Sequence, residues 1–283
     1  MALFNKDFGK AVRDVLTEDF PSVFEVEVNS KPGADLVVKT TAEFRDDNTV
    51  QSNIKPSFDT KYGKVELDFS SSGKITGTFT NRDSLAKNLK TSLSTNYEAS
   101  KQSVSVSGDY TFKQGTFSGK VNFPGYTLSA GAPSVVTGLV YNVQSNLNVG
   151  TELYLRTASE TGNYLEKVVG NLQLAKPDWI FSGNLIYANG NVDLIGRVLK
   201  RAGNVSYALE AGFKQKNSAS YVNVGLESRL ANQTTGKAVF KSEPFAVALS
   251  YKKRLDEITV TAATEVNLRT NNHKTGFSVD LNL

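Results

Sequence analysis

The sequence has no cysteine, a single histidine and no long apolar run, and each of these scarcities removes a class of protein. Without cysteine there is no disulfide framework, no thiol nucleophile and no cysteine-ligated zinc. One histidine, His273, leaves little for a catalytic triad or a metal centre. No stretch approaches the roughly 18 apolar residues of a membrane-spanning helix. We therefore expect no enzyme, no metal and no cofactor, and the mean hydropathy of −0.29 excludes a helical membrane protein.

The dominant pattern is an alternation of apolar and polar residues with a period of two. In 64–80, Val65, Leu67 and Phe69 alternate with charged residues before a turn of small residues, and the alternation then resumes. This pattern is typical of a β-hairpin with one apolar face. Nineteen such segments fill the chain after residue 22: 23–29, 35–44, 49–58, 64–69, 74–80, 88–98, 102–113, 115–130, 134–142, 147–157, 163–174, 179–188, 192–200, 204–214, 218–230, 236–242, 245–252, 257–268 and 273–283.

The apolar faces of these segments face either lipid or a soluble core. Strands of about 9–11 residues joined by tight turns are typical of a transmembrane up-and-down barrel, whereas a soluble sandwich has shorter strands and long crossovers. Charged residues stay off the apolar face in most segments, and tyrosine and phenylalanine recur near the segment ends, as in an interfacial girdle. The girdle residues are Phe44, Phe58, Tyr97, Phe112, Tyr187, Phe245 and Tyr251. We therefore predict that the apolar faces contact lipid.

The N-terminal residues 1–20 follow a different, helical period. An apolar stripe of Phe4, Phe8, Val12 and Val15 is predicted to dock the helix. The basic residues Lys6, Lys10 and Arg13 lie on the opposite face, and Pro21 ends the segment. We expect two units, a helix over 1–20 and a barrel over 21–283. An ordinary helix packed on a core is the alternative to a helix with a role of its own.

Several longer motifs resemble one family. The C-terminal strand carries Lys274, Gly276, Val279 and Leu281 at the spacing of the sorting signal of mitochondrial β-barrel proteins. "DFGKAVRDVLTEDF" (7–20) resembles the pore helix of the voltage-dependent anion channels, or mitochondrial porins. "DSLAKNLKTSLSTNY" (83–97) and "GAPSVVTGLVY" (131–141) also resemble that family, and the resemblance covers essentially the whole chain. Nineteen is the strand number known for this family, and an odd number makes the first and last strands parallel.

The resemblance implies a voltage-dependent, weakly anion-selective channel of the mitochondrial outer membrane that passes small metabolites such as ADP, ATP and phosphate. Expected partners are these metabolites in transit, the lipid bilayer, the mitochondrial sorting machinery and, in a homo-oligomer, further copies of the chain; nucleic acid is not expected. Lys6, Lys10 and Arg13 are expected at the constriction, where they influence selectivity. The basic residues in the lumen-facing phase are Lys39, Lys55, Lys64, Lys74, Lys90, Lys113, Lys120, Arg156, Arg197, Lys214, Lys252, Arg269 and Lys274.

The sequence departs from better-known family members at two positions. Leu67 stands where animal homologues often carry a lipid-facing glutamate, so roles of that glutamate do not transfer. The proposed nucleotide-contact segment Gly-Leu-Lys reads Asn88-Leu89-Lys90, and Lys90 is either a nucleotide contact or a solvated strand lysine.

Three other classes of protein remain as alternatives. The outer-membrane protein-import pore shares the barrel but usually has a longer N-terminal extension. A bacterial porin is expected to carry a secretory signal and to end in an aromatic residue, whereas this chain ends in Leu283. A soluble nucleic-acid-binding protein should cluster its basic residues with aromatic ones, although a net charge of +4 suits anionic small molecules, anionic lipid or nucleic acid equally.

Overall fold

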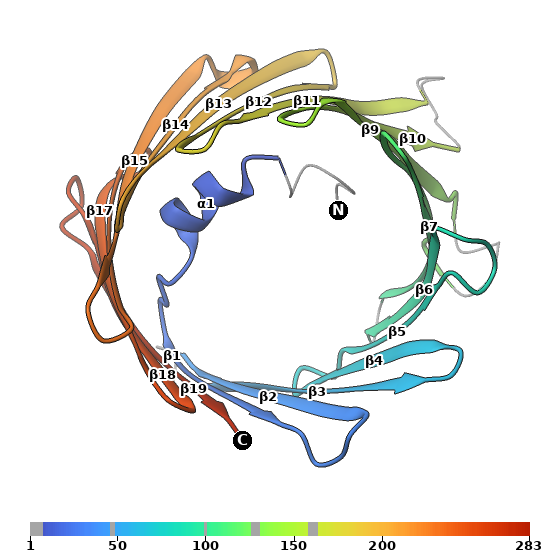
Figure 1. Ribbon diagram of the computed structural model, residues 1–283, viewed down its shortest axis with the longest axis horizontal. Coiled ribbons are helices and arrows are strands. Elements are labelled where there is room, and N and C mark those ends of the chain that lie inside the picture. The colour runs from blue at the N-terminus through green and yellow to red at the C-terminus, as the bar shows by residue number, and fades with distance from the viewer. Residues whose placement is uncertain (1–7, 46–48, 99–100, 126–130, 158–163) are drawn as a thin grey trace.

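The computed structural model describes residues 8–45, 49–98, 101–125, 131–157 and 164–283, and it is a closed barrel around one short helix (Figure 1). The helix α1 spans Lys10–Thr17 and a 3-10 turn, η2, spans Gln215–Asn217. The strands are β1 (Phe24–Ser30), β2 (Leu36–Phe44), β3 (Val50–Thr60), β4 (Gly63–Ser70), β5 (Ile75–Arg82), β6 (Leu89–Glu98), β7 (Lys101–Phe112), β8 (Gly115–Phe123), β9 (Ser134–Gln144), β10 (Leu147–Arg156), β11 (Leu165–Ala175), β12 (Trp179–Ala188), β13 (Asn191–Ala202), β14 (Val205–Lys214), β15 (Ala219–Leu230), β16 (Thr234–Ser242), β17 (Phe245–Leu255), β18 (Ile258–Asn267) and β19 (His273–Asn282).

Each strand pairs with its neighbours in the chain, and the sheet closes on itself by pairing β1 with β19. That closing pair is parallel, with Phe24 opposite Phe277 and Val28 opposite Leu281, whereas all other pairs are antiparallel. The predicted all-β barrel of nineteen strands with a parallel first and last pair is therefore confirmed. Of the segment predicted over 115–130, residues up to Phe123 form β8, and 126–130 lie outside the described residues.

The helix lies inside the ring of strands (Figure 1), so the wall residues that contact it identify the lumen face. Phe8 lies against Gly150 of β10, and Leu16 lies against Gly225 of β15. Strand positions in phase with these glycines face the lumen, and the alternate positions face outward.

The outward positions carry large apolar side chains at high exposure. Leu194 is 48%, Leu209 42% and Leu249 50% exposed. Apolar exposure spread around a whole barrel is a liability in water but suits hydrocarbon, where closure also gives every strand edge a partner. The outward face therefore contacts lipid. Among the described residues, no helix is long and apolar enough to cross a bilayer.

Within the described part of the predicted segment 1–20, α1 begins at Lys10 and ends at Thr17, so residues 18–20 are not helical. Phe4 and Lys6 lie outside the described residues. The helix α1 has eight residues, and an isolated helix of that length is marginal in water. Contacts with the barrel wall must therefore stabilise it.

The two faces of β14 give a matched test of this orientation. Leu209→Arg places a charge in hydrocarbon and should destabilise the inserted barrel by about 2–4 kcal/mol, whereas Ser206→Arg on the lumen face should cost little. Leu153→Arg and Asn148→Arg form the equivalent pair on β10. Urea unfolding in liposomes measures the difference, and equal losses within each pair would contradict the assignment of faces.

Candidate functional site: the helix in the lumen

The helix docks by an apolar stripe that matches the predicted one in part. Phe8, Val12 and Val15 are almost fully buried, with 4%, 0% and 4% of their surface exposed. Leu16, which the predicted stripe omitted, is equally buried. These four residues follow the spacing i, i+4, i+7, i+8 that puts side chains on one helix face. Asp19, in a left-handed conformation with φ of 65°, then turns the chain away, and Pro21 follows.

The wall beneath the helix carries apolar residues on its lumen side. Leu199 of β13, Ala208 of β14, Val239 of β16 and Ala248 of β17 form one buried cluster with Val12, Val15 and Leu16. Ile180 of β12 packs against the same cluster. All five wall residues occupy lumen positions, so these strands depart from a strict apolar-out, polar-in alternation. This departure builds the docking wall.

Three lumen-facing glycines let the N-terminal segment approach the wall closely. A methyl group on Gly150 would lie 3.0 Å from the Phe8 ring, and one on Gly225 would lie 2.8 Å from Leu16. At Gly276 the added carbon would lie 2.1 Å from the carbonyl oxygen of Pro21. Gly276 belongs to the predicted sorting motif, and in the structure the linker between helix and barrel crosses the wall directly over it.

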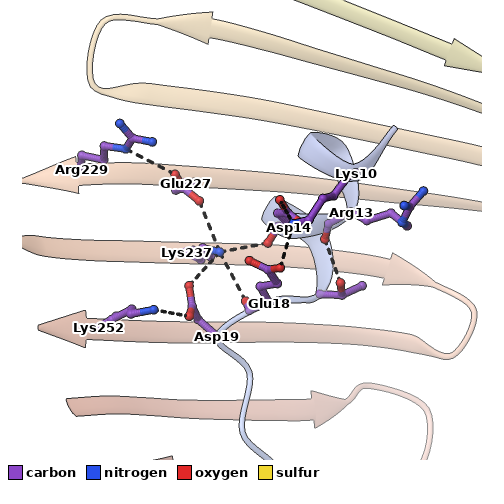
Figure 2. Close-up of polar contacts among 10 residues, drawn as sticks. Lys10, Arg13, Asp14, Glu18, Asp19, Glu227, Arg229, Lys237 and Lys252 are labelled. Carbon is purple, nitrogen blue, oxygen red and sulfur yellow. Dashed lines mark hydrogen bonds and ion pairs between the residues drawn. The ribbon is translucent and has the colours of Figure 1, made fainter. Parts of the chain in front are cut away.

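Lys237 of β16 fixes the C-terminal end of the helix (Figure 2). Its ammonium donates to the carbonyl oxygens of Asp14 at 3.0 Å and Glu18 at 3.4 Å, and it lies 2.9 Å from the Asp19 carboxylate. A helix C-terminus has unpaired carbonyls and a partial negative charge, which a cation stabilises. The Lys237 side chain is only 4% exposed, so its charge is neutralised by these groups and by Glu227 at 3.3 Å.

Asp19 joins this cluster to the next strand. Lys252 of β17 donates to its other carboxylate oxygen at 2.8 Å. Burial raises the pKa of Asp19, but the hydrogen bonds from Lys252 and Lys237 outweigh burial and hold the pKa below its ordinary value of 3.8. The stabilisation from Asp19 is therefore present above pH 3.8 and is lost as the pH falls through the lowered pKa. The helix stays latched at neutral pH.

The other end of the described segment is held by hydrogen bonds. The Gly9 amide donates to the Gln173 side-chain oxygen at 2.9 Å. Arg197, next to Gly9, is 7% exposed and donates to Glu210 at 2.6 Å and to Asn184. Arg197 was predicted as a lumen-facing charge, and the structure places it beneath the N-terminal end of the helix, paired with Glu210.

Lys10 and Arg13 are on the helix as predicted, but Lys10 is not an isolated charge. Its ammonium lies 2.6 Å from Asp14 and 3.3 Å from Glu18, and these ion pairs raise the pKa of Lys10. Arg13 donates to the Phe8 carbonyl oxygen at 2.6 Å. The lumen side of the helix thus presents a mixed basic and acidic surface, which weakens any preference for anions.

The predicted strand cations divide into three groups. Lys39, Lys55, Lys64 and Arg156 face the lumen, and each pairs with a carboxylate at 2.5–3.1 Å. Lys90, Lys120, Lys214 and Lys274 also occupy lumen positions, and Lys214 lies 5.7 Å from the Tyr221 ring centre. Lys74, Lys113 and Arg269 lie in turns at the rims and not on the wall. Arg197 and Lys252 are the exceptions, since Arg197 lies next to Gly9 and pairs with Glu210, and Lys252 binds Asp19.

Sequence reasoning missed Lys237 and the apolar docking wall. The wall had a signal, because "WIFSGNLIYA" (179–188) has apolar residues in both phases. Lys237 had none, since it is one of many lumen-facing lysines until its distance from residues 14–19 is known. In the described part of the chain, no group of three or more histidine, aspartate or glutamate residues could hold a metal ion.

A closed transmembrane barrel of this strand number encloses an aqueous channel, and the only described helix lies inside it. The fold and site therefore define a porin-type β-barrel channel. A sequence model of the eukaryotic porin family, the family of the voltage-dependent anion channels, matches residues 3–276, and the chain belongs to that family. A comparison with individually curated proteins gives no significant match.

We call the contacts of Lys237 and Lys252 with Asp14, Glu18 and Asp19 the latch, and replacing Lys237 tests it. Lys237→Met keeps the length of the side chain but leaves the helix carbonyls and Asp19 without its charge. Removing one member of a buried ion pair costs about 3–5 kcal/mol, and we expect the lower end because Lys252 still pairs with Asp19. Amide hydrogen exchange over residues 12–18 should accelerate. Lys241→Met is the control, because Lys241 is on the same strand but pairs with Glu265. Acceleration in the control alone, or in neither variant, would contradict the latch.

Gly276→Ala separates packing from sorting. The variant is refolded from denaturant, so no sorting machinery takes part, and the new methyl group must displace the linker at Pro21. Overpacking of this kind costs about 1–3 kcal/mol, and residues 18–24 should become more sensitive to protease. Gly236→Ala is the control, because an added carbon there meets open space. Identical protease sensitivity of the two variants would show that Gly276 has no packing role.

Proposed function

We propose that this porin is a voltage-dependent, weakly anion-selective channel that passes small anionic metabolites, such as ADP, ATP and phosphate, across the mitochondrial outer membrane. The observation that carries the proposal is the charged helix latched in the lumen by Lys237, Asp19 and Lys252. Membership of the eukaryotic porin family supports the channel. The motif at Lys274 and Gly276 supports recognition by the mitochondrial sorting machinery.

The latch offers a physical basis for voltage dependence. It consists of charged groups joined mainly by electrostatic contacts at a water-filled lumen. A membrane potential changes the energy of a unit charge by about 2.3 kcal/mol per 100 mV when the charge crosses the whole membrane, and by a fraction of that when it moves part of the way. The helix carries several charges, so the potential can weaken the contacts of Asp19 and shift the helix, and no catalytic step or cofactor is required.

The lumen charges support weak anion preference. Cations and carboxylates alternate around the wall, as in the pairs of Lys39 with Glu27 and Lys55 with Asp68. Paired charges act on passing ions less than free ones, so the selectivity depends on the surplus of cations. Lys90 and Lys120, at lumen positions of β6 and β8, contribute to that surplus.

The selectivity of the helix can be measured in a planar bilayer. Lys10→Glu with Arg13→Glu should move the reversal potential in a KCl gradient toward cation preference. These groups are on the helix that narrows the lumen, within about one Debye length, roughly 8 Å, of passing ions. High salt should reduce the shift.

The matched control is Lys90→Glu with Lys120→Glu, which changes the net charge equally but on the strands of a wider wall. Lys252 is unsuitable as a control because it holds Asp19. An equal or larger shift in the strand variant would mean that the helix does not form the constriction. A channel that shows no gating at any voltage would contradict the voltage dependence.

A further inference from the structure

The outward face of the barrel carries a cluster of cations and aromatic rings at one rim. Throughout 164–283, where every residue is described, Lys200 and Lys253 are the charged residues at outward positions of β12 to β18. Lys200 lies between Trp179 of β12 and Tyr207 of β14 in the sheet register. Its ammonium is 5.1 Å from the centre of the Trp179 ring, which stacks on Phe181 at 5.7 Å.

A second lysine lies on the other side of Trp179. Lys176 and Trp179 exchange backbone hydrogen bonds of 2.7 and 3.2 Å, as an antiparallel pair does. Paired residues share a face, so Lys176, Trp179, Lys200 and Tyr207 form one row on the outward face. The acid in this turn, Asp178, alternates to the opposite face beside Arg201, which donates its amide to the Asp178 carbonyl. The row therefore carries two positive charges and no carboxylate.

An apolar groove lies next to this row, further from the rim along β11, β12 and β13. It has a volume of about 470 Å³ and is lined by Leu172, Leu185, Leu194 and outward-facing glycines. Carbon atoms added to Gly183 or Gly196 would meet nothing closer than 3.9 Å, so the groove is open space. Gly183 is four residues along β12 from Trp179, or roughly 13 Å along the tilted strand, in the direction of the middle of the bilayer.

We propose that this surface, Lys176, Trp179, Lys200 and Tyr207 with the groove at Gly183 and Gly196, is a binding site for an anionic phospholipid. The two lysines bind the phosphate group, the rings of Trp179 and Tyr207 lie at the interface, and one acyl chain fills the groove. Aromatic side chains with lysine at a membrane interface place a lipid by its headgroup. A phospholipid accounts for the lysines, the aromatic rings and the apolar groove together. A soluble anion would bind only to the lysines and would leave the groove unexplained.

The chain contains its own probe, because Trp179 is the only tryptophan. The full chain is refolded in phosphatidylcholine liposomes with a small fraction of either brominated phosphatidylglycerol or brominated phosphatidylcholine. Bromine quenches tryptophan fluorescence on contact. Each lysine near an anionic headgroup favours its binding about fivefold, so the anionic quencher should act several-fold more strongly than the neutral one at equal mole fraction. Equal quenching by the two lipids would overturn the proposal.

The variants test each part of the site. Lys176→Gln with Lys200→Gln should bring the ratio of anionic to neutral quenching close to one. Lys253→Gln should leave it unchanged, because that lysine is four strands, roughly 19 Å, from Lys200. Gly183→Val with Gly196→Val should fill the groove and lower quenching by the anionic lipid.

Three results would overturn the proposal. If Lys253→Gln lowers the ratio as much as the double glutamine variant, the attraction is general surface charge. If inorganic phosphate at constant ionic strength restores equal quenching, the lysines bind a free anion. If the double valine variant is quenched like the wild type, the groove takes no acyl chain.

Discussion

Every backbone group of the wall must find a hydrogen-bond partner inside the sheet, because hydrocarbon offers none. In an open sheet of nineteen strands, β1 and β19 would each leave an edge unpaired. Pairing these two strands removes both edges, and the odd number obliges them to run parallel. This one pairing also places the start of β1, and with it the linker from the helix, at the closing seam. The position of the helix in the lumen thus begins with the need to close the sheet.

The lumen combines two kinds of contact that respond differently to their surroundings. The apolar cluster of Val12, Leu16, Leu199 and Val239 positions the helix whatever the pH or ionic strength. The ionic contacts around Lys237 and Asp19 depend on charge and are open to electric fields. A helix held by packing alone would be a fixed constriction, and one held by charge alone would not be positioned. Because apolar packing and ionic contacts act together, the helix has a defined resting position that an electric field can disturb.

The strands were predictable because lipid outside and water inside impose opposite demands on successive residues, as in 64–80 and at Leu209 against Ser206. The helix was predictable in kind, through Phe8, Val12 and Val15, but its end at Thr17 was not, because the prediction ran on to Pro21 whereas the chain already turns at Asp19. The roles of Arg197, Lys237 and Lys252 could not be predicted. Arg197 and Lys252 were predicted as lumen-facing cations and Lys237 was not, and the partner of each lies more than a dozen residues away in the chain, in two cases more than two hundred.

The contacts of the N-terminal segment have a consequence for the order in which the molecule assembles. Gly9 bonds to a residue 164 positions later, Asp14 to one 223 later and Asp19 to one 233 later. Contacts so distant in the chain form slowly, because a long loop must close first. The strands that receive the helix, β13 to β17, together with Gly276 on β19, are among the last to be synthesised. The helix is synthesised before these strands but reaches its place only after they have formed, and until then its apolar stripe must be covered by other contacts.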